Sequence, residues 1–152
     1  MREPDVGAAV PSPGESSRQS GTHAREGSAG RRDAIVIVGP CASGKSTLAE
    51  NLVRLGYQAR IVGQEHSDIQ RLWQRHEPAV VIGLVVSFET VRARRGRGWS
   101  RAVYDRQQQR LGPAMAAATV VLDTGKLSPM ATLAAAAAAI RGVGIRPSLP
   151  AG

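Results

Sequence analysis

Eight consecutive residues have the types and spacing that would let a protein backbone surround a phosphate group. Residues 39–46 read Gly-Pro-Cys-Ala-Ser-Gly-Lys-Ser and match G-x-x-x-x-G-K-[ST], the Walker A pattern, at every fixed position. The glycines let successive N–H groups converge on an anion, and a following helix adds the partial positive charge of its N-terminus. Lys45 is predicted to reach the β- and γ-phosphates of ATP, and the Ser46 hydroxyl is predicted to ligate Mg²⁺. The predicted nucleotide contacts are Gly39, Cys41, Ala42, Ser43, Gly44, Lys45, Ser46 and Thr47.

The segments on either side of this pattern support the prediction. Residues 33–38 form a short apolar run rich in β-branched side chains, which is typical of a buried parallel strand. After the pattern, Leu48, Leu52 and Leu55 follow a helical spacing, and Gly56 is expected to end that helix. A strand, a glycine-rich turn and a helix form the context in which this pattern binds nucleoside triphosphates.

Composition divides the chain into three parts. Residues 1–31 are rich in Gly, Ser and Pro without hydrophobic periodicity, which predicts a disordered N-terminal tail. Residues 32–141 are expected to form one domain, and residues 142–152 contain Gly and Pro breakers and are expected to form a flexible C-terminal tail.

The global composition favours a soluble protein of the cytoplasm. The 152 residues include one cysteine, which excludes an internal disulfide and suits a reducing compartment. No apolar run approaches the roughly 18 residues of a membrane span, and no signal-type stretch follows Met1, so we expect no membrane partner.

Strand and helix patterns alternate through the expected domain. Strands are predicted near 58–62, 79–86 and 119–122, in addition to 33–38; helices are predicted at 47–55, 67–75, 88–95, 101–111 and 128–140. This alternation predicts an α/β fold with three layers, in which helices flank a parallel sheet of four to five strands.

Two further segments, together with residues 39–47, resemble those of a known family. Residues 82–95 join an apolar strand to an arginine-rich helix, and residues 120–124 end an apolar strand in Asp-Thr. With the Walker A pattern, these segments resemble the small P-loop kinases of metabolites and nucleotides, the group of shikimate, adenylylsulfate and nucleoside kinases within the P-loop nucleoside triphosphate hydrolase superfamily. The chain departs from that group because no separate strand carries the expected Walker B aspartate.

Arginines are concentrated in one stretch of the chain. Residues 92–110 contain seven arginines and one aspartate and supply most of the net charge of +8. The resemblance implies that Arg94, Arg95 and Arg101 belong to a mobile lid that neutralises the charge developing during phosphoryl transfer. The alternative is a solvated basic face, which most charged runs form.

Polar residues follow the second predicted strand, at the edge where ligands collect in open parallel sheets. Glu65 is a candidate for orienting an acceptor hydroxyl or for holding Mg²⁺ through water, and His66 and Asp68 are weaker candidates. The alternative is that Ser67 and Asp68 simply begin the next helix.

Three functions are compatible with these residues. The leading hypothesis is an ATP- and Mg²⁺-dependent kinase of an unidentified small anionic metabolite or nucleotide, with Lys45, Glu65, Arg94, Arg95 and Arg101 as its catalytic residues. The second is a nucleotide-binding regulatory protein with little or no turnover, which the absent Walker B aspartate favours. The third and weakest is a nucleic-acid-binding module that uses the basic stretch electrostatically.

Overall fold

Four parallel strands form a single sheet, which confirms the predicted α/β class. The computed structural model describes residues 33–148, so the predicted tail over residues 1–31 lies outside the described residues. The strands are β1 (Ala34–Val38), β2 (Gln58–Ile61), β3 (Val80–Val85) and β4 (Val120–Asp123), and their spatial order is β2-β1-β3-β4. All three neighbouring pairs are parallel, so the carboxyl ends of the four strands lie along one edge of the sheet.

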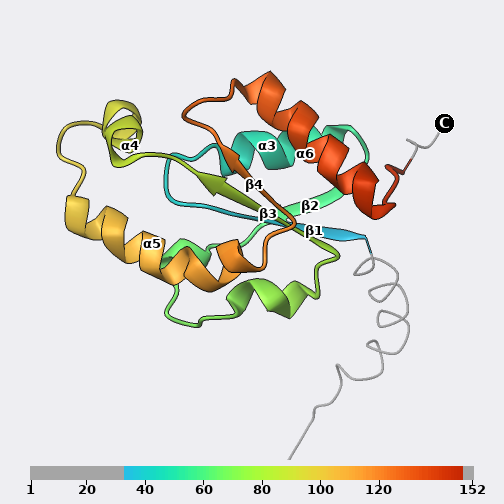
Figure 1. Cartoon of the computed structure of the whole chain (residues 1–152), viewed down its shortest axis with the longest axis horizontal. Helices are drawn as coiled ribbons and strands as arrows, with labels where there is room; N and C mark the ends of the chain where they lie inside the picture. Colours follow the sequence, from blue (N-terminus) through green and yellow to red (C-terminus); the bar gives the residue numbers. More distant parts are fainter. Residues whose placement is uncertain (1–32, 149–152) are drawn as a thin grey trace, which may run out of the picture.

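Helices cover both faces of this sheet (Figure 1). The α-helices are α3 (Lys45–Arg54), α4 (Phe88–Arg95), α5 (Arg101–Ala116) and α6 (Pro129–Val143), and two short 3₁₀ helices are η1 (Gln64–His66) and η2 (Leu72–His76). Helices α3 and α6 lie on one face, and α5 lies on the other.

The alternating side chains of β1 divide the core into two clusters. Ile35 and Ile37 pack with buried residues of α3 and α6, whereas Val36 and Val38 pack with buried residues of η2 and α5. A strand that is apolar on both sides and covered by helices on both faces is the arrangement that parallel sheets require. Burial of β1 therefore fixes the position of the loop that follows it.

Serine caps begin three of the helices. The Oγ atoms of Ser87, Ser100 and Ser128 accept the backbone N–H of the residue three positions later, at the starts of α4, α5 and α6. The predicted starts at Ser87 and at Ser128, where Pro129 takes the first helical position, are confirmed.

The predicted helix over 67–75 is wrong. Ser67 is extended and its Oγ accepts the N–H of Ile69, two residues later, so it forms a local turn instead of a cap. The buried Gln64 side chain donates to Ile69 O and accepts the Trp73 N–H, and these bonds hold an irregular connection between η1 and η2. Hydrogen bonds to the Gln64 side chain thus replace the helical hydrogen bonds expected over 67–75.

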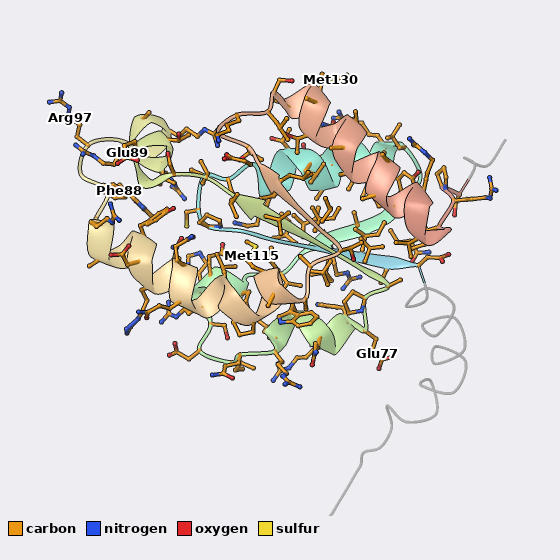
Figure 2. All side chains as sticks on the ribbon, in the orientation of Figure 1. Glu77, Phe88, Glu89, Arg97, Met115 and Met130 are labelled. Atoms are coloured by element: carbon orange, nitrogen blue, oxygen red, sulfur yellow. The ribbon has the colours of Figure 1, made fainter. Side chains whose placement is uncertain are left out.

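Helix α5 continues beyond its predicted end at Leu111. It passes Pro113 and reaches Ala116, because Leu111 and Ala114 are fully buried against the sheet and their packing offsets the hydrogen bond that proline removes. Met115, labelled in Figure 2, belongs to the same contact. Its sulfur lies 2.5 Å from where a Cβ on Gly83 would stand, so a larger residue at that point of β3 would displace the Met115 side chain.

The C-terminal segment is packed further than predicted. Residues 142–148 were expected to be flexible, but α6 runs to Val143, Gly144 ends it at φ 98°, and Ile145 joins the core. The Ser148 N–H donates to Gly56 O at 2.9 Å, and the packed chain therefore extends at least to Ser148. Within residues 33–148, no helix combines the length and the apolar character needed to cross a lipid bilayer.

Candidate functional site

The segment that runs from the end of β1 into the first turn of α3, residues 39–46, is called here the glycine loop. Its backbone depends on both glycines: Gly44 adopts φ 92°, and a Cβ on Gly39 would lie 2.7 Å from Ser43 Oγ and 3.0 Å from the Leu84 Cβ. Ala42 also has a positive φ of 64°, which costs free energy for a residue with a side chain. The loop therefore holds a backbone shape that ordinary turns avoid.

The Lys45 side chain folds back over the glycine loop. Its Nζ donates to Gly39 O at 2.8 Å and to Pro40 O at 2.9 Å, and it lies 2.9 Å from Glu65 Oε2. The side chains are only 11% and 4% exposed for Lys45 and Glu65, so both charges are largely withdrawn from water. The ion pair joins the carboxyl end of β1 to the segment that follows β2.

Glu65 lies in η1, the turn that the end of β2 directs towards the glycine loop. One carboxylate oxygen, Oε2, contacts Lys45, while the buried Oε1 has no hydrogen-bond partner. Behind it, Arg110 donates to Glu65 O at 3.3 Å and to the Asp68 carboxylate at 2.9 Å. The sequence prediction that Glu65 faces the glycine loop agrees with this geometry, whereas Asp68 pairs with Arg110 instead.

Two cavities border the glycine loop. A cavity of about 410 Å³ lies between the loop, α4 and α6, and is lined by Ala42, Ser43, Gly44, Thr47, Leu48, Arg94, Thr124, Leu127, Pro129 and Thr132. A second cavity of about 320 Å³ is lined by Cys41 to Thr47, Glu65, His66 and Arg95. Glu65 is the one carboxylate among the residues that line them. The larger cavity contains one charged side chain, Arg94, among apolar and hydroxyl-bearing residues, whereas the smaller one contains Lys45, Glu65 and Arg95.

The hydroxyl groups of the loop differ in exposure. Ser46 is exposed and lines the smaller cavity, and Thr47 lines both cavities. Ser43 is fully buried with its Oγ unpaired. Across the larger cavity, the Oγ1 of the buried Thr132 in α6 also has no partner. These groups leave hydrogen-bonding capacity unused at the loop and at the far wall of the larger cavity.

The three arginines predicted for a lid take three different positions. Arg94 donates to Ala42 O at 2.6 Å and to Thr124 O at 2.8 Å, so it clamps the glycine loop to the end of β4. Arg95 lines the smaller cavity and lies over the Trp99 ring, 5.3 Å from its centroid.

Arg101 is not part of this arrangement. It stacks over Phe88, with 5.0 Å to the ring centroid, and its Nε donates to Asp105 at 3.1 Å. It lines neither cavity, because these local partners hold it on the start of α5. Figure 2 shows that Arg97, in the connection between α4 and α5, points away from the rest of the molecule.

Two residues support the loop: Gln107, which sequence reasoning missed, and Thr124, which belongs to the Asp-Thr ending that the resemblance singled out. Gln107 of α5, which is 3% exposed, accepts the Cys41 N–H through Oε1 at 3.0 Å and donates from Nε2 to Cys41 Sγ at 3.2 Å. Thr124 Oγ1 donates to Ser43 O at 2.7 Å. Thr124 directly follows β4, whereas nothing in the polar sequence around Gln107 marks the Gln107 side chain as buried.

Two ionisable groups elsewhere have shifted pKa values. Burial raises the pKa of Tyr104, whose hydroxyl donates to Val86 O at 2.7 Å. Burial and the neighbouring positive charge of Arg60 lower the pKa of His76. Neither side chain lines the cavities beside the glycine loop.

The geometry can hold an anion beside a buried ammonium group, with a carboxylate opposite and an apolar cavity adjoining. Comparison of the chain with protein-family models, with curated proteins and with solved structures finds no match in any of the three. The site itself is thus the basis for a functional conclusion.

Proposed function

We propose that this protein binds Mg·ATP at the glycine loop and transfers the γ-phosphoryl group to a small anionic metabolite or nucleotide. The observation that carries the proposal is the position of Lys45. Lys45 stands at the start of α3 and lines the 320 Å³ cavity, its ammonium group lies 2.9 Å from the carboxylate of Glu65, and both residues are at the carboxyl edge of a parallel sheet. Ligands of open α/β sheets bind at this edge.

The residues present fit the triphosphate and its metal ion. Backbone N–H groups of the glycine loop and the N-terminus of α3 would hold the phosphates, and Lys45 would exchange Glu65 for phosphate oxygens. The exposed Ser46 hydroxyl would ligate Mg²⁺, which supplies neutralisation of charge between the phosphates. The larger cavity would take the base, where the unpaired Thr132 hydroxyl offers a polar contact beside Leu48 and Leu127.

The acceptor would occupy the smaller cavity. Once Lys45 turns to the phosphates, Glu65 becomes a buried carboxylate without its cation, which suits it to accept a proton from an acceptor hydroxyl. Arg95 lines the same cavity and offers a cation for an anionic group of the acceptor. Arg101 is assigned no role in this mechanism.

A second function is favoured by the position of Arg94. Its guanidinium is already committed to two backbone carbonyls, which leaves Arg95 as the arginine side chain lining the smaller cavity. A site with few free cations suits a nucleotide-binding regulatory protein with slow turnover. Both functions require ATP binding, and they differ in whether an acceptor becomes phosphorylated.

Binding is tested by thermal unfolding with Mg·ATP. At about 100 times its Kd, the ligand should stabilise the fold by about 2.7 kcal/mol, and Lys45→Ala should lose most of that shift because it removes a contact to the phosphates. Lys126→Ala is the matched control, because Lys126 is the other lysine of the chain and is exposed. An unchanged melting curve of the wild-type protein with ATP, ADP and GTP would refute the proposal.

Turnover is tested by incubating the protein with labelled ATP and a panel of small anionic acceptors. If the protein is a kinase, one compound of the panel should gain the mass of a phosphoryl group. It also predicts that Glu65→Gln lowers kcat strongly while ATP still binds. Nucleotide binding without transfer to any acceptor would favour the regulatory function instead.

A further inference from the structure

Three metal-ligating side chains converge where the glycine loop meets η1. Cys41 Sγ, a carboxylate oxygen of Glu65 and His66 Nε2 all lie within 4.8 Å of one another. Thiolate, imidazole and carboxylate together form the ligand set typical of zinc, whereas Mg²⁺ and Ca²⁺ prefer oxygen ligands alone.

The separations between these atoms are close to those around a tetrahedral ion. Bond lengths of about 2.3 Å to sulfur and about 2.0 Å to nitrogen or oxygen place ligand atoms roughly 3.3–3.6 Å apart at tetrahedral angles. Here Cys41 Sγ lies 3.7 Å from His66 Nε2, and Glu65 Oε2 lies 3.5 Å from the same nitrogen. These two separations are close to tetrahedral values, and the third, from Cys41 Sγ to the Glu65 carboxylate, is at most 4.8 Å.

Glu65 supplies an independent indication that a ligand belongs here. Its side chain is 4% exposed and lines the smaller cavity, yet Oε1 has no hydrogen-bond partner. A buried carboxylate oxygen without a partner carries a large desolvation cost, which a cation would offset. Lys45 contacts the other oxygen, Oε2, which also lies 3.5 Å from His66 Nε2, so an ion held between these side chains would bind the carboxylate that Lys45 pairs with.

The surroundings fix the sulfur and leave a route to solvent. Gln107 holds Cys41 through both its backbone N–H and its Sγ, which is the kind of support that orients metal ligands. The His66 side chain is 62% exposed, so an ion can enter from that side and water can provide a fourth ligand. A thiolate and a carboxylate would balance the two charges of Zn²⁺.

We propose that Cys41, Glu65 and His66 form a zinc-binding site that joins the glycine loop to η1. Binding replaces the thiol proton of Cys41 by the Zn–S bond and releases that proton to the buffer, because a metal ion binds the deprotonated sulfur. The site goes beyond the proposed function and does not depend on it, because its ligands are in place without nucleotide.

The proposal is tested by titrating the full, untagged, metal-free chain with Zn²⁺ against a chromogenic chelator. We expect one high-affinity ion per chain and a rise in melting temperature. His66→Ala and Cys41→Ser should each weaken binding by more than about tenfold, and His76→Ala is the matched histidine control that should bind as wild type. Because His66 is exposed, its alanine variant is expected to fold, which circular dichroism will verify.

Cobalt identifies the sulfur ligand directly. Co²⁺ bound to the wild-type chain should show a thiolate-to-metal charge-transfer band in the near ultraviolet, and Cys41→Ser should lose it. Zinc affinity unchanged in both His66→Ala and Cys41→Ser, or bound cobalt without the thiolate band, would overturn the assignment. Neither readout uses ATP, so a failure of the zinc site is distinguishable from a failure of nucleotide binding.

Discussion

Replacing Glu65 by glutamine should make nucleotide bind more tightly, although Glu65 lies in the site. In the empty protein, Lys45 pairs with Glu65 at 2.9 Å, and the proposed function requires Lys45 to leave that carboxylate for phosphate oxygens. At an effective dielectric constant of about 20, the attraction over this distance is ~6 kcal/mol. Desolvation of the two buried charges offsets most of this attraction. We therefore expect the glutamine variant to lose about 1–2 kcal/mol of the free energy of unfolding.

The free energy of the Lys45–Glu65 pair also affects the affinity for nucleotide. Wild-type protein must break the pair and leave a buried carboxylate without its cation, whereas the glutamine variant has no such cost. A gain of about 1–2 kcal/mol corresponds to roughly 5- to 30-fold tighter binding. The unliganded variant should melt lower than wild type, and the variant should show the larger thermal shift on adding nucleotide.

The suitable assay is isothermal titration calorimetry with ATP in a buffer that contains EDTA. Because EDTA removes Mg²⁺, the measured affinity contains no contribution from Glu65 to Mg²⁺ binding. Asp68→Asn serves as control, since that carboxylate pairs with Arg110 and does not contact Lys45. If Glu65→Gln bound ATP with wild-type affinity or more weakly, Lys45 would not exchange Glu65 for phosphate, and the proposed mechanism would be refuted.

Three further predictions follow from contacts outside that pair. Arg94→Ala should destabilise the fold by about 1–3 kcal/mol in urea denaturation, because it loses two bonds to carbonyls at a partly exposed site; an equal effect of Arg97→Ala would contradict the clamp. Gly56→Ala should lower the free energy of unfolding by more than about 1 kcal/mol, because φ is 99° and the new Cβ would lie 2.2 Å from Ser148 O. Gly142→Ala, whose Cβ would meet open space on α6, should instead raise the free energy of unfolding by about 0.5–1 kcal/mol. Similar melting temperatures for the two variants would refute this account. The lowered pKa of His76 means that the folded state binds fewer protons than the unfolded chain below about pH 6.5. Stability should therefore fall as pH decreases below that value, and His76→Gln should show a smaller fall between pH 7.5 and 5.5 in thermal melts.

The elements around the glycine loop could be predicted because their signals are local. The apolar run of β1, the glycines and the leucine spacing of α3 all lie within about 20 consecutive residues. The helix caps are equally local, because the Oγ atoms of Ser87 and Ser128 accept the backbone N–H of the residue three positions later. In each case the physical cause of the structure is contained in the segment that displays it.

The features that were missed depend on contacts distant in sequence. Gln107 and Cys41 are 66 positions apart, and Arg94 is 30 positions from Thr124, its second carbonyl partner. The lid prediction for Arg94 came from the arginine-rich stretch and from the family resemblance, which implied arginines that close over the nucleotide. In the structure its nearest acceptors are the carbonyls of the loop itself, and no sequence pattern identifies those.

The docking of the C-terminal turn has a consequence for the order of folding. Ile140 and Ile145 complete the cluster that β1 and α3 begin about a hundred residues earlier, and Ser148 bonds back to Gly56. During synthesis, the face of the sheet beneath α6 therefore stays uncovered until about residue 148 has emerged from the ribosome. Parallel strands offer no hairpin that could close earlier. The nascent chain is consequently exposed to aggregation until this segment has been made.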